Sequence, residues 1–510
     1  MSITLTGNTL TLAQVESVAR SGVQCEVAPA ARAAMLASRA VIDRVVDSEE
    51  TAYGVNTGFG ELAEVRISSD QIRKLQLNLI RSHACGVGAP LSEIETRAVM
   101  LLRANALAKG LSGVRPVVVE VLCAMLNRGV HPVLPGQGSV GASGDLAPLA
   151  HLALVIIGEG EALYRSSRIP GGDAMELAGI APLALEAKEG LSLLNGTQGM
   201  LALLALAIGE AHLLADAADV AAALSMDALR GSPAAFDARI AAARPHPGHA
   251  LVAQNLTRLN RGSRIRESHR SAKHDPRVQD AYSLRCTPQV HGAVRDALAH
   301  ICATLEIELN SATDNPLVFV EPRGPAGAGV VLSGGNFHGQ PLAMAADQMA
   351  VALATLGGIS ERRIAHMTNP QTSLLPAFLT ADPGLNSGFM LAQVTAAALA
   401  SENKVLASPH SVDSIPTSGD QEDYVSMGMA AARRLRPMIE NLRRILAIEL
   451  LAAAQGIDLL APLTTGVEAE KAKALVRKRA AKLDADRSLA PDVEAIAALI
   501  ARGEFSQFLL

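Results

Sequence analysis

The central loop of the chain runs from residue 136 to residue 151 and reads Gly136-Gln-Gly-Ser-Val-Gly-Ala-Ser-Gly-Asp-Leu-Ala-Pro-Leu-Ala-His151. Six of its first nine residues are Gly or Ser, and Pro135 precedes it. Glycine lets a backbone enter conformations that are closed to other residues. Such a segment either cradles a phosphate group or forms a loop whose own backbone must do something unusual.

Two motifs of other protein classes can be tested on this loop. Gly136, Gly138 and Gly141 match the G-x-G-x-x-G pattern of dinucleotide-binding proteins. That pattern should follow a buried strand, yet residues 131–135 are short and bounded by proline, and no alternation of strands and helices surrounds them. The nucleophile-elbow pattern G-x-S-x-G fails because Asp145 stands at its last glycine. A nucleotide-binding protein and a catalytically inactive helical scaffold remain the alternatives from other classes.

The residue types at positions 142–144 suit the formation of an electrophile from the backbone itself. Gly144 has no side chain to obstruct attack by its nitrogen, Ala142 is small, and Ser143 carries a hydroxyl that can be eliminated. Because an amide nitrogen is a poor nucleophile, the fold must compress the backbone there. The product would be an electrophile that no ordinary side chain provides.

The segment Ala142-Ser143-Gly144-Asp145 resembles the one that the histidine and phenylalanine ammonia-lyase family converts into its cofactor, 4-methylidene-imidazol-5-one. In that family the glycine nitrogen attacks the alanine carbonyl and two waters are lost. The resemblance extends over nearly the whole chain, with the motifs in the family's order. It implies a cofactor formed autocatalytically from Ala142, Ser143 and Gly144, and no need for a metal or a nucleotide.

Three of the four tyrosines lie in polar or glycine-rich loops: Tyr53, Tyr282 and Tyr424. A phenol titrates near pH ~10, so it accepts a proton at neutral pH only where nearby charge lowers its pKa. The resemblance implies that Tyr53, at the start of the glycine-rich loop 53–60, is the general base. A mobile loop with a buried ring is the alternative.

The segment Gln279-Asp-Ala-Tyr-Ser-Leu-Arg285 contains three further candidates. The planar guanidinium of Arg285 suits bidentate binding of an amino-acid carboxylate. The resemblance implies that Gln279 and Tyr282 support cofactor formation and hold the substrate. A single arginine at the start of a helix is more often a solvated surface residue.

Three other positions match functional residues of the family. Asn195 places an amide inside an apolar run, where it needs a hydrogen-bond partner, although such residues also cap chain breaks next to glycine. The resemblance implies that Asn195 binds the cofactor carbonyl or the substrate. It also implies that Phe337 lies against the cofactor, but Phe337 could equally be a core aromatic. Glu422 lies in an acidic run that would usually be solvated, and it matches the family's carboxylate near the leaving group.

The pair Ser82-His83 bears on the substrate. It resembles the pair of histidine lyases, whereas tyrosine lyases carry His-Leu and phenylalanine lyases carry Phe-Leu at this position. The segment that faces the substrate side chain differs from the histidine-lyase pattern at two places. Tyr424 stands where histidine lyases usually carry His, and the pair 419–420 is also less usual. The implied reaction is elimination of ammonia from L-histidine to give trans-urocanate. A lyase or aminomutase acting on tyrosine, phenylalanine or another aromatic or imidazole amino acid is the alternative within the family.

Composition predicts a mainly α fold. Apolar residues make up 49% of the chain, Trp is absent, and alternating β-branched runs are few. Long Ala/Leu segments at about 200–231, 285–313, 338–366, 386–405 and 423–455 predict a long-helix bundle, followed by shorter helices at 467–484 and 490–502. A smaller, α-rich N-terminal domain, residues 1–200, would carry the Tyr53 loop and the cofactor loop, and residues 201–510 would form the bundle. Residues 243–281 are basic and poorly periodic, which predicts an extended loop.

Charge and hydropathy restrict the partners of the chain. The net charge of −5, with both signs interspersed, argues against a nucleic-acid surface. Residues 190–209 carry no charge, but three polar side chains cluster within them, which favours a buried core helix over a membrane span. The N-terminus lacks a basic region followed by an apolar run, so a cytoplasmic enzyme is expected. Family resemblance and the apolar helices together predict a homotetramer with shared active sites.

Overall fold

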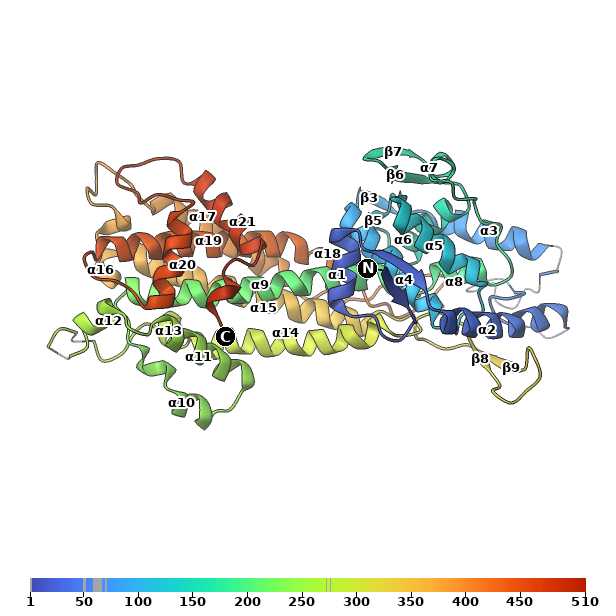
Figure 1. The fold of residues 1–510 in the computed structure, drawn as a ribbon, viewed down its shortest axis with the longest axis horizontal. Helices are drawn as coiled ribbons and strands as arrows, with labels where there is room; N and C mark the ends of the chain where they lie inside the picture. The colour runs from blue at the N-terminus through green and yellow to red at the C-terminus, as the bar shows by residue number, and fades with distance from the viewer. Residues whose placement is uncertain (1, 49–51, 58–66, 69–70, 272, 276) are drawn as a thin grey trace. The chain divides into compact units, whose positions relative to one another are not determined.

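The computed structural model describes residues 2–48, 52–57, 67–68, 71–271, 273–275 and 277–510. Helices dominate these residues, and the strands form only small sheets, so the predicted mainly α fold is confirmed (Figure 1). The chain forms two compact units. Unit 1 comprises 1–206, 302–347 and 409–433, and unit 2 comprises 207–301, 348–408 and 434–510. The division into contiguous domains 1–200 and 201–510 stays a prediction.

Unit 1 contains helices and all the strands of the described residues. Its helices are α1 (Leu12–Ser21), α2 (Pro29–Asp47), α3 (Ile72–His83), α4 (Glu93–Ala108), α5 (Pro116–Arg128), α6 (Leu146–Ile156), α7 (Gly171–Leu177), α8 (Glu189–Leu194) and α18 (Gly428–Arg433). Its strands are β1 (Ser2–Leu5), β2 (Gln24–Val27), β3 (Val87–Pro90), β4 (His131–Pro132), β5 (Pro135–Gln137), β6 (Glu161–Tyr164), β7 (Ser167–Pro170), β8 (Leu317–Val320) and β9 (Gly329–Leu332). Three long helices contribute residues to both units: α9 (Gln198–Ala228), α14 (Thr287–Leu309) and α15 (Gln340–Thr368).

Local sequence signals set the ends of the helices in unit 1. Thr11 caps α1 in a complete capping box with Gln14, and Ser92 does the same for α4 with Glu95. The helix α1 ends at Gly22, whose φ of 67° lies in the left-handed region that glycine enters without a Cβ clash. These signals fix the helix boundaries before tertiary packing contributes.

The sheets of unit 1 are small. β1 pairs with β2 in parallel, with Ser2 opposite Gln24 and Leu5 opposite Val27. β3 pairs with β5, and β8 with β9, both antiparallel, while β4, β6 and β7 form an antiparallel sheet. Within the described residues, the strand before the central loop is therefore antiparallel to its neighbour and belongs to no βαβ unit, contrary to what a dinucleotide-binding motif requires.

The regular elements of unit 2 are all helices among its described residues. Its further elements are α10 (Ala238–Ala243), α11 (Pro247–Leu259), α12 (Arg264–Ser268), α13 (Tyr282–Arg285), α16 (Pro370–Ser373), α17 (Met390–Leu406), α19 (Leu435–Leu459), α20 (Val467–Arg477), α21 (Ala490–Ala501) and the 3₁₀ turns η3 (Pro233–Phe236), η4 (Ala377–Leu379) and η5 (Ser506–Phe508). The helices α17, α19 and α21 pack side by side (Figure 1). Inside the unit, Arg363 and Glu449 form a fully buried ion pair, whose carboxylate also accepts hydrogen bonds from Ser225 and Ser360.

Two predictions about the helices are wrong. Residues 243–281 are not one extended loop, because α11 and α12 lie within them. The buried residues of α11 recur at helical spacing (Val252, Ala253, Leu256 and Leu259), so the periodicity was present but masked by the surrounding Pro, His and Arg residues. The helix predicted at 423–455 begins only with α18 and α19, because residues 417–427 form a turn that packs against the central loop.

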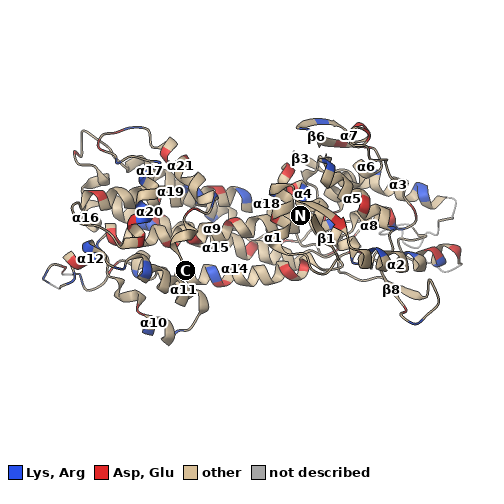
Figure 2. Cartoon of the chain, in the orientation of Figure 1, with Lys and Arg blue, Asp and Glu red and all other residues tan. Residues whose placement is uncertain are grey.

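Two helices of the described chain are long and apolar enough to cross a membrane by length and composition, α9 and α15. Their most apolar windows are 72% and 61% buried inside the protein, and buried core helices pass the same test. The apolar segment 190–209 is interrupted at residues 195–197, between α8 and α9. Lys, Arg, Asp and Glu are interspersed along the helices (Figure 2).

His131 gives unit 1 a specific sensitivity to acid. Arg97 can only donate, so the 2.8 Å bond from its Nη1 makes Nε2 of His131 an acceptor, and Nδ1 then faces Glu93 Oε1 at 3.2 Å. Burial and the Arg97 charge lower the pKa of His131 to about 4. The unfolded chain binds this proton near pH ~6.5, so the stabilisation is present at pH 7 and is lost as pH falls from there towards 4.

We therefore expect wild-type protein to lose about 2 kcal/mol of unfolding free energy between pH 7 and pH 5 through His131 alone. The variant His131→Gln keeps an acceptor and a donor but does not titrate, so its loss over this range should be smaller by that amount. Urea unfolding of both proteins at the two pH values measures the difference. Equal pH dependence of the two proteins would contradict the assignment.

Candidate active site

The backbone of the central loop is pressed against the chain break between α8 and α9. Gly144 and Gly196 form a parallel bridge, in which Asp145 N donates to Gly196 O at 2.7 Å and Gly196 N donates to Ser143 O at 3.4 Å. Gly144 has a φ of +76°, and a Cβ placed on it would collide with the carbonyl of Gly196. Position 144 can therefore hold only glycine, and the segment 142–144 is held close to a neighbouring backbone.

Asp145 ties this loop to the first turn of α9. The side chain is fully buried, and its carboxylate accepts hydrogen bonds from Ser139 Oγ and Met200 N, both at 2.8 Å, and from Gly199 N. Burial raises the pKa of Asp145 to about 6, while these hydrogen bonds oppose the rise. The helix α6 starts directly after Asp145, but the carboxylate makes no capping bond to α6. It binds the N-terminus of α9, where a negative charge is favourable.

Ser143 contacts a residue 279 positions away. Its hydroxyl donates to Glu422 Oε1 at 2.8 Å. The second carboxylate oxygen, Oε2, accepts from Thr417 Oγ1 at 2.6 Å and from Ser418 Oγ at 3.1 Å. Backbone hydrogen bonds in both directions pair Thr417 with Glu422, so a tight turn presents the carboxylate. The turn passes through Gly419 and Asp420, whose φ values of 62° and 67° lie in the left-handed region that favours glycine and that Asp occasionally adopts.

His83 is the last residue of α3 and is half-buried. Its Nδ1 lies 2.9 Å from Leu79 O. A carbonyl oxygen only accepts, so Nδ1 carries the proton of the neutral ring and Nε2 keeps a free lone pair. Burial lowers the pKa of His83, although its bond to Leu79 and the charge of Glu422 oppose this. His83 is therefore a neutral hydrogen-bond acceptor within the electrostatic field of Glu422.

Asn195 ends α8 and has an incompletely satisfied amide. It is 5% exposed, and its Oδ1 is buried with no hydrogen-bond partner among the described residues. Its backbone oxygen accepts from Arg103 Nη1 at 2.7 Å. Burial lowers the pKa of Arg103 to about 10. A buried amide oxygen without a partner is costly, so a polar group is expected to complete this position.

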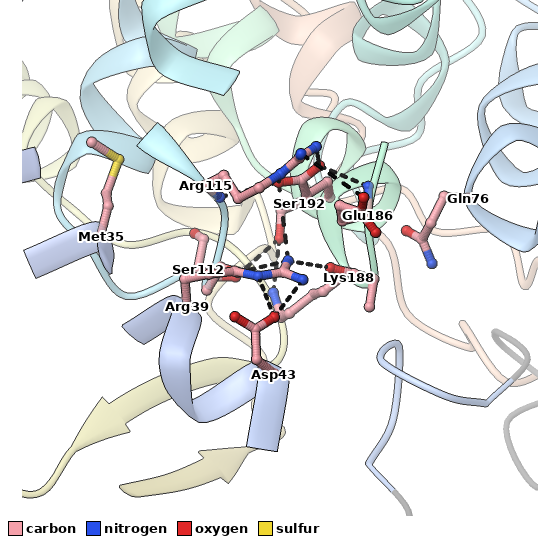
Figure 3. Close-up of polar contacts among 12 residues, drawn as sticks. Met35, Arg39, Asp43, Gln76, Ser112, Arg115, Glu186, Lys188 and Ser192 are labelled. Atoms are coloured by element: carbon pink, nitrogen blue, oxygen red, sulfur yellow. Dashed lines mark hydrogen bonds and ion pairs between the residues drawn. The ribbon is translucent and has the colours of Figure 1, made fainter. Parts of the chain in front are cut away.

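A polar cluster around Lys188 and Ser192 holds α8 in place (Figure 3). Lys188 Nζ binds Asp314 Oδ2 at 2.8 Å and Ser192 Oγ at 2.8 Å. Arg115 binds Glu189 through Nε at 2.8 Å and Nη2 at 2.7 Å. No motif predicts this cluster, since Arg115 and Asp314 are distant in sequence from Lys188, Glu189 and Ser192. A Lys-Glu pair next to an uncharged apolar helix was the only available signal.

The segment with Phe337 is also pinned to the central loop. Gly339 N donates to Gly141 O at 3.2 Å, and Phe337 itself is half-buried. His338 stacks on Tyr424 with ring centroids 6.2 Å apart, and its Nε2 lies 3.1 Å from Tyr424 O. Tyr424, the departure from the histidine-lyase pattern, therefore has a stacking partner of its own within unit 1.

Tyr53 lies in a turn that packs against α8. Gly54 N donates to Thr57 Oγ1 at 3.2 Å, and a Cβ on Gly54 would collide with the Leu191 side chain. Tyr53 itself is half-buried. The later part of the predicted loop, residues 58–60, lies outside the described residues.

The three candidates from 279–285 belong to unit 2, whereas the residues above belong to unit 1. Gln279 and Arg285 line one hollow, and Tyr282, whose side chain is 73% exposed, lines another with Arg362 and His366. Arg363, which forms the buried ion pair with Glu449, also donates from Nη1 to Ser283 O at 3.4 Å. This bond connects α13 to the ion pair. The structure thus groups the candidates into two sets, one in each compact unit.

Two other kinds of site can be compared with these residues. No group of three or more His, Cys, Asp or Glu side chains able to hold a metal occurs in the described part of the chain. A hollow of about 1250 Å³ in unit 2, lined by η3, α10, α11 and α12, contains none of the predicted site residues. The glycines of the dinucleotide pattern face protein atoms, since a Cβ on Gly141 would collide with Ser426 Oγ. The loop therefore has no phosphate cradle at that glycine.

Comparison with known families decides which chemistry this geometry serves. The family described as aromatic amino acid lyase matches residues 10–478. The chain belongs to the aromatic amino acid lyase family. It is 56% identical over 509 residues to a histidine ammonia-lyase of Koribacter versatilis, covering 98% of both chains.

Solved structures of aromatic amino acid lyases agree. The histidine ammonia-lyase of Trypanosoma cruzi is 44% identical, with a TM-score of 0.91 over 100% of this chain and 95% of that chain. The tyrosine aminomutase of Streptomyces globisporus is 40% identical, with a TM-score of 0.93 over 100% of this chain and 98% of that chain. Lyases and aminomutases of different substrates therefore share this fold.

Proposed function

We propose that this chain is a histidine ammonia-lyase that converts L-histidine to trans-urocanate and ammonia. The observation that carries the proposal is the central loop: the backbone of 142–144 is pressed against Gly196, and the hydroxyl of Ser143 binds Glu422. These residues fit 4-methylidene-imidazol-5-one, which would form from Ala142, Ser143 and Gly144. Asn195 directly precedes Gly196, and its buried Oδ1, which has no hydrogen-bond partner among the described residues, supplies an acceptor beside that backbone.

The cofactor would supply an electrophile that captures the substrate amino group and so improves it as a leaving group. Around it, Tyr53 would remove the β-proton, as the family resemblance implies, and Arg285 would hold the substrate carboxylate with its two-pronged guanidinium. Gln279, Tyr282 and Phe337 would complete the site. All of these roles are carried over from matching positions of the family.

Substrate choice is proposed from His83 and Glu422. A neutral substrate imidazole has one N–H donor and one acceptor nitrogen. The lone pair on His83 Nε2 suits the donor, and the two relatives named histidine ammonia-lyase support histidine over the tyrosine named for the aminomutase relative. Separate incubations with histidine, tyrosine and phenylalanine, with products identified by mass spectrometry, test the proposal. Formation of a β-amino acid, or a preference for tyrosine or phenylalanine, would overturn it.

The variant His83→Leu is expected to lower kcat/KM for histidine by about 100-fold, because one imidazole nitrogen would lose its buried partner. Ser82→Ala is the matched control. It removes the 3.0 Å contact of Ser82 Oγ with His83 Nδ1 but leaves the bond between His83 and Leu79 in place, so it should change kcat/KM by less than about ten-fold. Steady-state kinetics on histidine and tyrosine measure both variants. Unchanged histidine kinetics in His83→Leu would remove His83 from the binding site.

We further propose a cytoplasmic homotetramer with shared active sites. The apolar helix α17 has only two buried residues, Ala396 and Asn403, whereas Leu391, Val394 and Val405 are 51–70% exposed. Exposed apolar side chains along one helix favour a protein partner, and identical subunits in closed symmetry are the simplest one. The strong exposure of Tyr282 points the same way, since a substrate-binding ring should be largely covered in the complete site.

A further inference from the structure

The contact between Ser143 and Glu422 has a role before any substrate binds. In the chain as translated, Glu422 Oε1 accepts the hydroxyl proton of Ser143, while Oε2 is fixed by Thr417 and Ser418. In a mature cofactor that hydroxyl no longer exists. The bond between Ser143 and Glu422 therefore exists only before maturation, when Thr417 and Ser418 hold the carboxylate against the serine hydroxyl.

The loss of the serine hydroxyl needs two proton transfers. The Cα–H bond of Ser143 must break so that the Cα–Cβ double bond can form, and the Oγ must receive a proton because hydroxide is a poor leaving group. No oxidant or further reactant is required. One carboxylate next to the hydroxyl can carry out both transfers in turn.

We propose that Glu422 is the general base and then the general acid that dehydrates Ser143 during cofactor formation; this rests on the function proposed above. Gly144 N first attacks the Ala142 carbonyl carbon, and one water leaves. The new ring withdraws electrons from Ser143 Cα, so Glu422 takes the Cα proton. As the double bond forms, the Cβ–Oγ bond breaks, and Glu422 returns the proton to Oγ, which leaves as the second water.

Asp145 is the other carboxylate near this loop, but its contacts give it a different role. Both of its oxygens are occupied by Ser139 Oγ and by backbone N–H groups of α9, and it is fully buried. It therefore holds the backbone in position for ring closure. Glu422 alone has an oxygen within hydrogen-bond distance of the Ser143 hydroxyl among the described residues.

The same assignment explains how Glu422 can also serve the substrate. Once the second water has left, Oε1 loses its partner on Ser143, while Oε2 keeps Thr417 and Ser418. The carboxylate is then positioned, with one oxygen free, beside the newly formed electrophile. Maturation would thus uncover the group that later binds the imidazole.

The test is the mass of the protein itself. Wild type, Glu422→Gln and Asp423→Asn are expressed in parallel. The mass of the peptide containing residues 142–144 is measured by mass spectrometry at intervals after synthesis. Asp423→Asn is the matched control, because it removes one charge from the same segment at an exposed position. We expect wild type and the control to lose two waters. We expect Glu422→Gln to accumulate the form that has lost one water, with the second loss slowed at least about 100-fold.

Further variants separate this role from a failure to fold. Glu422→Asp keeps a carboxylate on a shorter side chain, so it should lose the second water faster than Glu422→Gln, and this comparison decides the matter if the Gln variant folds poorly. Loss of both waters at the wild-type rate in Glu422→Gln, or loss of neither in a folded variant, overturns the proposal. If wild type itself loses no water, the cofactor and the proposed function fail instead.

Discussion

Replacing Ser143 with alanine is expected to abolish ammonia release from histidine, with a loss of roughly four orders of magnitude or more. Without the β-hydroxyl no methylidene can form, and no other side chain in the loop offers an electrophile. The fold should survive, because Ser143 is half-buried and the variant loses one hydrogen bond, worth about 1 kcal/mol. Activity on histidine tests the loss of ammonia release, intact mass tests the absence of the methylidene, and thermal unfolding tests the fold, all on one sample.

Ser139→Ala is the control for this prediction. It also removes a serine hydroxyl from the central loop, one that donates to Asp145 Oδ1 at 2.8 Å. Ser143 and Glu422 remain, so this variant should still lose two waters and keep substantial activity. Activity of Ser143→Ala comparable to wild type would show that the loop is not the source of an electrophile.

The helices were the part of the fold that the sequence could predict. Apolar spacing and end signals are local, and each long helix was predicted within a few residues except α19. The failure at 243–281 shows the limit of this reasoning. There α11 is amphipathic over only 13 residues, and the neighbouring prolines and basic residues dominate any longer window. The start of α19 was predicted wrongly because it depends on tertiary contacts. Hydrogen bonds to Val140 and Gly141, far away in sequence, fix the turn at 417–427.

The candidate site was predictable only as a set of residues. A motif identifies Ser143 and Glu422, but it says nothing about the hydrogen bond that joins them across 279 positions. The same holds for Lys188 and Asp314, which form a buried ion pair 126 positions apart. Such pairs depend on how helices pack, and a single sequence carries no local trace of them. Roles in proton transfer follow from these contacts, so they become arguable only with the structure.

The variants Tyr53→Phe and Arg285→Ala should each be inactive alone, but mixed tetramers of the two should regain activity. We expect Tyr53→Phe and Arg285→Ala to lose most activity, because one lacks the proposed base and the other lacks the carboxylate anchor. Tyr53 belongs to unit 1 and Arg285 to unit 2, and the exposed α17 favours assembly of several chains. If one active site takes Tyr53 from one subunit and Arg285 from another, some sites of a mixed tetramer contain neither substitution.

The measurement is activity after co-refolding the two inactive chains in equal amounts. Random mixing should restore about a quarter of the sites, since each of the two positions is intact in half of the cases. Mixing must be confirmed independently, for example by native mass spectrometry of chains that differ in isotope labelling. Refolding each variant alone is the control and should restore nothing. Confirmed hybrids that stay as inactive as both parents would mean that Tyr53 and Arg285 of one chain serve the same site, and that the assembly buries α17 without sharing catalysis.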